Sequence, residues 1–196
     1  ACFGTSRVAV YKNKFDGMAR DSLNETASTG IEAYGGCSEL IADGNISTEQ
    51  QSMFYVYSGG RPYFREGFVT MEPTYFNVYK NNRADTCYCL ARIVVSTPRG
   101  DKSSDDPNPY YKFPHSEDAA LLGNVYRNNA AENITAGVWR FESRVENQYM
   151  QMSVFENNTA SNFGDYIDFR HYLRSTIEHT LPSYIVDQLF INEENK

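Results

Sequence analysis

The sequence predicts one β-rich domain: an antiparallel meander forming a closed or nearly closed barrel, with a C-terminal helical segment packed against it. Between residues 52 and 96, aromatic and β-branched residues recur and are interrupted by Gly59-Gly60 and Asn81-Asn82, a pattern typical of short strands joined by turns. The 15 Tyr and 12 Phe favour sheets over helix bundles. Near the C-terminus the apolar period changes from two to 3.6 residues.

A chain of 196 residues fits a single domain, 1–196. We expect a β-rich body over residues 1–160 and helices over 161–192. The body starts with a strand over 7–11, and the polar stretch 21–36 is interpreted mainly as a loop. Asp43-Gly44 predicts a hairpin turn, because glycine tolerates the positive φ that such a turn needs.

The central strands follow in order. Residues 75–79 are expected to form one strand, Asn81-Asn82 a turn, and 87–95, the most apolar run, the most buried strand. Pro-rich residues 97–114 predict a long surface loop. Further strands are expected at 121–126, 135–143 and 148–155. We recognise no internal repeat.

The C-terminal pattern predicts a helix. One face of this helix would contain Asp165, Tyr166, Phe169, Leu173 and Ile177, which recur at helical spacing. Pro182 ends this helix, and a second short helix follows it.

The four cysteines predict disulfides. Cys87 and Cys89 are two apart on a strand, so they point to the same face and cannot easily pair with each other. Each would pair with Cys2 or Cys37, and the sequence leaves both pairings open. A metal site is disfavoured, because no CxxC pair or neighbouring histidine completes a tetrahedral set.

An extracellular, secreted protein is expected from the even cysteine count, the mature-looking start Ala-Cys-Phe and the glycosylation sequons. The sequons lie at Asn24, Asn45, Asn133 and Asn157. The net charge of −7 and the absence of a basic run argue against nucleic acid as a partner. No apolar run reaches the length of a membrane span.

No catalytic motif is apparent. The three histidines, His115, His171 and His179, have no G-x-S-x-G elbow or other nucleophile signature to accompany them. We therefore expect a protein that is not an enzyme, with a secreted hydrolase as the second alternative.

The expected layout of a barrel followed by a helix is similar to that of secreted lipocalin-type barrels, although the Gly-x-Trp of those proteins is missing near the N-terminus. This architecture implies a carrier of a small apolar ligand such as a lipid, retinoid, carotenoid or haem-like compound, with no certain cofactor. The candidate ligand-binding residues on strands are Tyr75, Tyr79, Trp139, Phe141, Tyr149 and Met152. The alternative is a subunit of an extracellular oligomeric storage or protective protein, whose partners would be copies of itself or related subunits.

Overall fold

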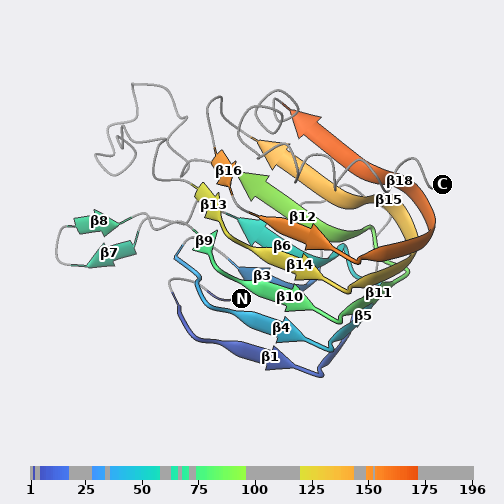
Figure 1. The fold of residues 1–196 in the computed structure, drawn as a ribbon, viewed down its shortest axis with the longest axis horizontal. Helices are drawn as coiled ribbons and strands as arrows, with labels where there is room; N and C mark the ends of the chain where they lie inside the picture. The colour runs from blue at the N-terminus through green and yellow to red at the C-terminus, as the bar shows by residue number, and fades with distance from the viewer. Residues whose placement is uncertain are drawn as a thin grey trace.

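The chain forms a parallel β-helix, in which strands from successive turns of the chain stack into sheets around one interior (Figure 1). The computed structural model describes residues 2, 5–17, 28–33, 36–57, 63–65, 68–70, 74–95, 120–143, 149–151 and 153–171.

Three sheets form the walls of the parallel β-helix. Sheet C contains β1 (Ala9–Tyr11), β4 (Ile41–Asp43), β10 (Val78–Lys80), β14 (Val125–Arg127) and β17 (Val154–Glu156). Sheet B contains β9 (Thr74–Tyr75), β13 (Ala120–Leu122) and β16 (Tyr149–Gln151). Sheet A contains β2 (Lys14–Asp16), β3 (Thr29–Ala33), β5 (Ile46–Thr48), β6 (Ser52–Tyr57), β11 (Arg83–Asp85), β12 (Cys89–Val95), β15 (Ala130–Ser143) and β18 (Thr159–His171).

The chain visits these sheets in a fixed order, and each circuit is called a coil. The coils are β1–β3, β4–β6, β9–β12, β13–β15 and β16–β18. Every pairing between coils is parallel, and in sheet C the coils are in register; Val78, for example, lies between Ile41 and Val125. Only the separate hairpin of β7 (Tyr63–Arg65) and β8 (Phe68–Thr70) is antiparallel among the described strands. The predicted antiparallel, lipocalin-like meander is therefore wrong, although the sheets do enclose a nearly closed interior.

The backbone at the corners explains why the meander prediction failed. A type I′ hairpin turn needs positive φ at both central residues. At the corners between sheets C and A only the first residue has it, as in Gly44 (67°), Asn81 (55°) and Asn128 (54°). One left-handed residue bends the chain into the next sheet of the same coil and does not reverse it.

A second set of corners joins sheets B and C. The predicted single strand 75–79 is divided here, because Phe76 has a φ of 54° and the chain turns between β9 and β10. In the next coil Gly123 occupies this position with a φ of 58°. The Phe76 ring covers Gly123 so closely that an added Cβ would lie 2.6 Å from a ring carbon.

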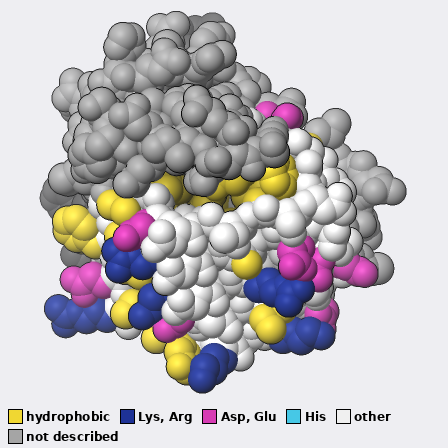
Figure 2. Space-filling view, turned by 45° about the vertical axis from the view of Figure 1, so that its right-hand side comes forward, with side chains coloured by type: hydrophobic (Ala, Val, Ile, Leu, Met, Phe, Trp, Pro, Cys, Tyr) yellow, Lys and Arg dark blue, Asp and Glu magenta, His cyan; other side chains and the backbone are white. Residues whose placement is uncertain are grey.

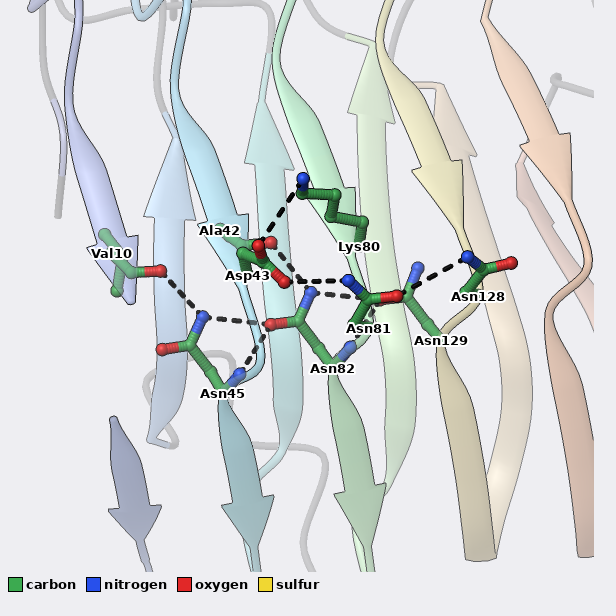
Figure 3. Close-up of polar contacts among 9 residues, drawn as sticks. All are labelled: Val10, Ala42, Asp43, Asn45, Lys80, Asn81, Asn82, Asn128 and Asn129. Carbon is green, nitrogen blue, oxygen red and sulfur yellow. Dashed lines mark hydrogen bonds and ion pairs between the residues drawn. The ribbon is translucent and has the colours of Figure 1, made fainter. Parts of the chain in front are cut away.

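The second residue of each corner between sheets C and A is an asparagine whose side chain points inward and bonds to the next coil (Figure 3). The Oδ1 of Asn82 accepts the backbone N–H and the Nδ2 of Asn45, both at 2.9 Å. Asn82 donates in turn to Oδ1 of Asn129, at 3.1 Å from N and 3.0 Å from Nδ2. Asn13 and Asn158 continue this ladder at its two ends.

Aromatic rings fill the space between sheets C and A. Tyr79 stacks on Tyr126 with centroids 4.9 Å apart and planes at 7°, and Tyr126 stacks on Phe155 at 4.8 Å and 12°. The edge of Trp139 meets Phe155 at 5.0 Å. These separations match the 4.7–4.9 Å distance between neighbouring strands, so in-register coils place the rings in stacking contact.

The C-terminal helix prediction is also wrong where it can be compared. Asp165, Tyr166 and Phe169 belong to β18, which pairs in parallel with β15. Leu173 and Ile177 lie outside the described residues. No helix is present among the residues that the structure describes. The bulge between Ile134 and Gly137 shifts the register of this long strand pair and interrupts its two-residue alternation.

Charged side chains occupy the outside of the coils. Figure 2 shows them in groups on either side of a broad band of backbone and uncharged polar side chains. Many pair with the next coil: Arg83 with Glu132 at 2.6 Å, and Arg127 with Glu156 at 2.7 Å. These pairs are half exposed and each contributes about 0–1 kcal/mol, so the interior carries most of the stability.

The asparagine ladder yields a test. Asn82→Ala removes the acceptor for Asn45 and the donors to Ala42 and Asn129. It should lower the free energy of unfolding by about 2–4 kcal/mol, because buried polar groups are left unpaired. Asn81→Gly is the matched control, since that exposed residue already has positive φ. Urea unfolding measures both, and equal losses from the two variants would contradict this role for the ladder.

Candidate binding edge

The two longest connections between strands of successive coils leave from one corner, at the carboxyl ends of the sheet A strands β6 and β12, and a shorter one leaves there from β15; residues 17–28 join β2 to β3 at another corner. Residues 58–73 connect β6 to β9, residues 96–119 connect β12 to β13, and residues 144–148 connect β15 to β16. Because all these strands are parallel, the three connections start side by side on successive coils. We call this corner the binding edge.

The other corners of the same coils are short. Between sheets C and A the chain needs only two residues in each coil, for example Gly44-Asn45 or Asn81-Asn82. Between β5 and β6, or β11 and β12, it needs three residues. Long connections are where binding residues usually lie when a rigid scaffold positions them. The binding edge is therefore the best candidate for a functional site.

One row of side chains crosses sheet A close to this edge. Stacking of the coils aligns Glu32, Tyr55, Arg92, Arg140 and Asp168 as direct neighbours on five successive strands. The Arg92 guanidinium lies 5.0 Å from the centre of the Tyr55 ring. The Arg140 guanidinium lies 5.5 Å from the centre of the Tyr88 ring. A guanidinium held over a ring keeps its planar set of N–H donors in a defined orientation.

The residues of this row differ in burial, so the buried ones can support the row while the half-buried ones can contact a ligand. Arg92 is 5% exposed, whereas Tyr55, Arg140 and Asp168 are half-buried. Two arginines one coil apart repel each other unless acidic groups are close. Glu32 and Asp168 stand at the two ends of the row. The half-buried Arg140 carries guanidinium N–H donors of the kind that bind carboxylate and sulfate groups.

The predicted ligand-binding residues lie elsewhere. Tyr79, Trp139 and Phe141 are fully buried in the aromatic packing of the interior. Tyr75 is half-buried at the corner and contacts Phe76 edge to face, with centroids 5.3 Å apart. Tyr149 belongs to β16, and Met152 lies outside the described residues. Of the six predicted residues, Tyr79, Trp139 and Phe141 therefore belong to the hydrophobic core.

The predicted disulfides are wrong, because all four cysteines are free thiols. Cys2 pairs with Ala33, which aligns with Val56 and Ile93 on the neighbouring strands. Cys89 lies four residues before Ile93, which is roughly 13 Å along the strand, beyond the reach of a disulfide. Cys87 and Cys89 instead donate to backbone carbonyls of Asp85 (3.4 Å) and Gln51 (3.5 Å).

Cys37 is the thiol with the most altered acidity. Burial, reinforced by the neighbouring Cys2 thiol, raises the pKa of Cys37 to about 12. Burial also raises the pKa of Tyr79 and of Tyr126 above the ordinary value of a tyrosine. These groups are held in their neutral forms within the core.

The predicted glycosylation sites differ in accessibility. Asn45 is fully buried in the asparagine ladder. Asn133, within β15, and Asn157, at the corner between β17 and β18, are both exposed and both have positive φ. Asn24 lies outside the described residues.

The described residues contain no group of three or more His, Cys, Asp or Glu side chains placed to hold a metal ion. They also contain no helix long and apolar enough to cross a membrane. His171 ends β18, while His115 and His179 lie outside the described residues.

Comparisons with known proteins give no relative: no protein-family model, curated protein or solved structure matches this chain.

An internal repeat carries the signal for this fold, so the expectation of no internal repeat is wrong. The segments Val78-Tyr-Lys-Asn-Asn, Val125-Tyr-Arg-Asn-Asn and Val154-Phe-Glu-Asn-Asn align residue for residue in sheet C and its corner. Each is followed two residues later by alanine. A repeat of this kind indicates stacked units that share a continuous core. The repeat is hard to recognise in the sequence because the connections between coils differ in length and space its copies unevenly.

Free thiols are the first testable consequence. Protein prepared without reductant should show four reactive thiols after denaturation, and only slow reaction of Cys37, Cys87 and Cys89 in the folded state because they are buried. Titration with a thiol reagent, with and without denaturant, measures both. Fewer than four thiols in the denatured protein would contradict the structure.

The raised pKa of Cys37 predicts a dependence of stability on pH. The folded value of about 12 lies above the ordinary 9.0, so the folded state holds the proton more tightly than the unfolded state does. Stability should be complete below about pH 9 and should fall as the pH rises toward 12. Urea midpoints measured across this range should decline, and less steeply in Cys37→Ala. A midpoint that rises with pH would refute this.

Proposed function

We propose that this protein is a secreted recognition module that binds an acidic polysaccharide at the binding edge. The observation that carries the proposal is that the strands carrying Arg92 and Arg140 end at the corner from which residues 96–119 and 144–148 leave. A rigid parallel β-helix keeps that row in a fixed position, so little conformational entropy is lost when a ligand binds.

The chemistry of the row favours an acidic ligand. Guanidinium groups bind carboxylate and sulfate through paired, planar hydrogen bonds. Neighbouring coils repeat at about 4.7–4.9 Å, so an extended chain lying across the strands can meet one coil after another. The net charge of −7 does not prevent this binding, because charges beyond about 8 Å are largely screened at physiological ionic strength.

The connections supply further suitable residues. Residues 58–73 and 96–119 include aromatic and charged side chains near the middle of each stretch, among them Tyr63, Phe64, Arg65, Tyr110 and Tyr111. Aromatic and arginine side chains are enriched where proteins meet their ligands. Secretion is part of the proposal and is supported by the exposed sequons Asn133 and Asn157.

The earlier predictions of an apolar-ligand carrier and of a storage subunit stay predictions. Exposed Tyr11, Ile41, Ile46 and Phe76, which are 42–58% exposed, offer apolar contact area to a second subunit. The interior rings Tyr79, Tyr126 and Phe155 contact one another across three coils.

Arg140→Gln tests the proposal. Loss of one charged contact should weaken binding of an acidic oligosaccharide, such as an oligogalacturonate, by about tenfold or more, equivalent to about 1.4 kcal/mol. Arg83→Gln is the matched control, because Arg83 pairs with Glu132 at a corner away from the binding edge. Calorimetry with unglycosylated protein measures both affinities.

A second variant tests the connections. Replacing residues 96–119 with a five-residue linker copies the length of the β15–β16 connection, which already spans this corner. The coil should fold with an unchanged urea midpoint, while oligosaccharide affinity falls. Equal binding of neutral and acidic oligosaccharides, or no binding of either by the wild-type protein, would overturn the proposal.

A further inference from the structure

The asparagines of the sequons differ in whether their side-chain amide can accept a glycan. In N-glycosylation, Nδ2 of asparagine forms a bond to the anomeric carbon of an oligosaccharide carried on a polyprenyl pyrophosphate. The bond between that carbon and the pyrophosphate breaks, and the amide loses one proton to the medium. The acceptor therefore gives up one of its two N–H groups and needs open space beside it.

Asn45 cannot meet these needs in the folded protein. It is fully buried, and its Nδ2 donates to the Val10 carbonyl and to Asn82 Oδ1, both at 2.9 Å. Its Oδ1 accepts from the backbone N–H of Asn13 at 2.9 Å. Substitution of Nδ2 would break the ladder and place a bulky hydrophilic sugar inside the core.

Asn157 and Asn133 meet the same needs. Asn157 is exposed at the corner before Asn158, and among the described residues its side chain has no hydrogen-bond partner. Thr159, which completes its sequon, is also exposed. Asn133 is exposed and uses Nδ2 for one bond, to Asp85 Oδ1 at 2.9 Å. It can keep that bond through its second N–H after glycosylation.

We propose that Asn133 and Asn157 are the glycan acceptors of the described coils, and that glycosylation at Asn45 and folding exclude each other. The inference rests on the secretion included in the proposed function. Asn157 lies at the corner between β17 and β18 and Asn133 near the start of β15, so neither lies at the corner from which the long connections leave. Glycans there would cover the side of the coil and leave the binding edge open.

Ser47→Ala provides a test that leaves the ladder intact. It removes the sequon at Asn45 but only a buried hydroxyl from the structure, one without a hydrogen-bond partner among the described residues. Thr135→Ala and Thr159→Ala are the matched controls, because they remove the sequons of Asn133 and Asn157 at exposed positions. All variants are expressed as the full chain in a eukaryotic secretory host.

Glycopeptide mapping of the secreted, folded protein gives the result. Asn133 and Asn157 should carry glycans and Asn45 none, and Ser47→Ala should be secreted at least as well as the wild-type protein with the same glycan map. Thr135→Ala and Thr159→Ala should each lose one glycan. A glycan on Asn45 in protein with a native urea midpoint would overturn the proposal, as would an empty Asn133 or Asn157. Because oligosaccharide binding is measured on unglycosylated protein, failure of either proposal is distinguishable from failure of the other.

Discussion

The fold depends on one feature of the corner between sheets C and A: a left-handed residue followed by an inward-pointing asparagine. The left-handed residue bends the chain without reversing it, as at Asn81. The asparagine then accepts two N–H groups from one neighbouring coil and donates to the next, as Asn82 does with Asn45 and Asn129. Corner polar groups that would be costly to bury are thereby satisfied inside the stack.

The asparagine ladder sets the register between neighbouring coils, and that register sets how the interior side chains pack. Once Asn45, Asn82 and Asn129 are aligned, the residues three positions before them are aligned too, and these are Ala42, Tyr79 and Tyr126. Stacking distances of 4.8–4.9 Å are a consequence of the strand spacing. Within sheet A, β6 is buried on both faces at Met53 and Phe54, which are each fully buried although adjacent residues point in opposite directions.

Several strand positions could be predicted from sequence, but strand direction could not, and two strands were missed: β3 lies in the predicted loop 21–36 and β18 in the predicted helix. The apolar run 87–95 contains β12, and the stretch 121–126 overlaps β13 and β14. An Asn-Asn pair suits both a hairpin and a corner, and the two differ in the φ of the second residue; in Asp43-Gly44 it is the first residue, Asp43, that lacks the positive φ of a type I′ turn. The repeat beginning Val78-Tyr-Lys-Asn-Asn would have decided between them, because hairpins give no reason for the same five positions to recur.

The candidate site was beyond the reach of sequence reasoning for a related reason. Tyr55, Arg92, Arg140 and Asp168 are separated by unequal lengths of chain and become neighbours only through register. Each coil contacts only the coils beside it, so a connection can lengthen at one corner without disturbing the ladder at another. The β12–β13 connection is far longer than the β15–β16 connection, yet both rejoin the same sheet. A fold that tolerates insertion at one corner, and holds a charged row fixed beside it, separates the part that provides stability from the part that is free to acquire binding.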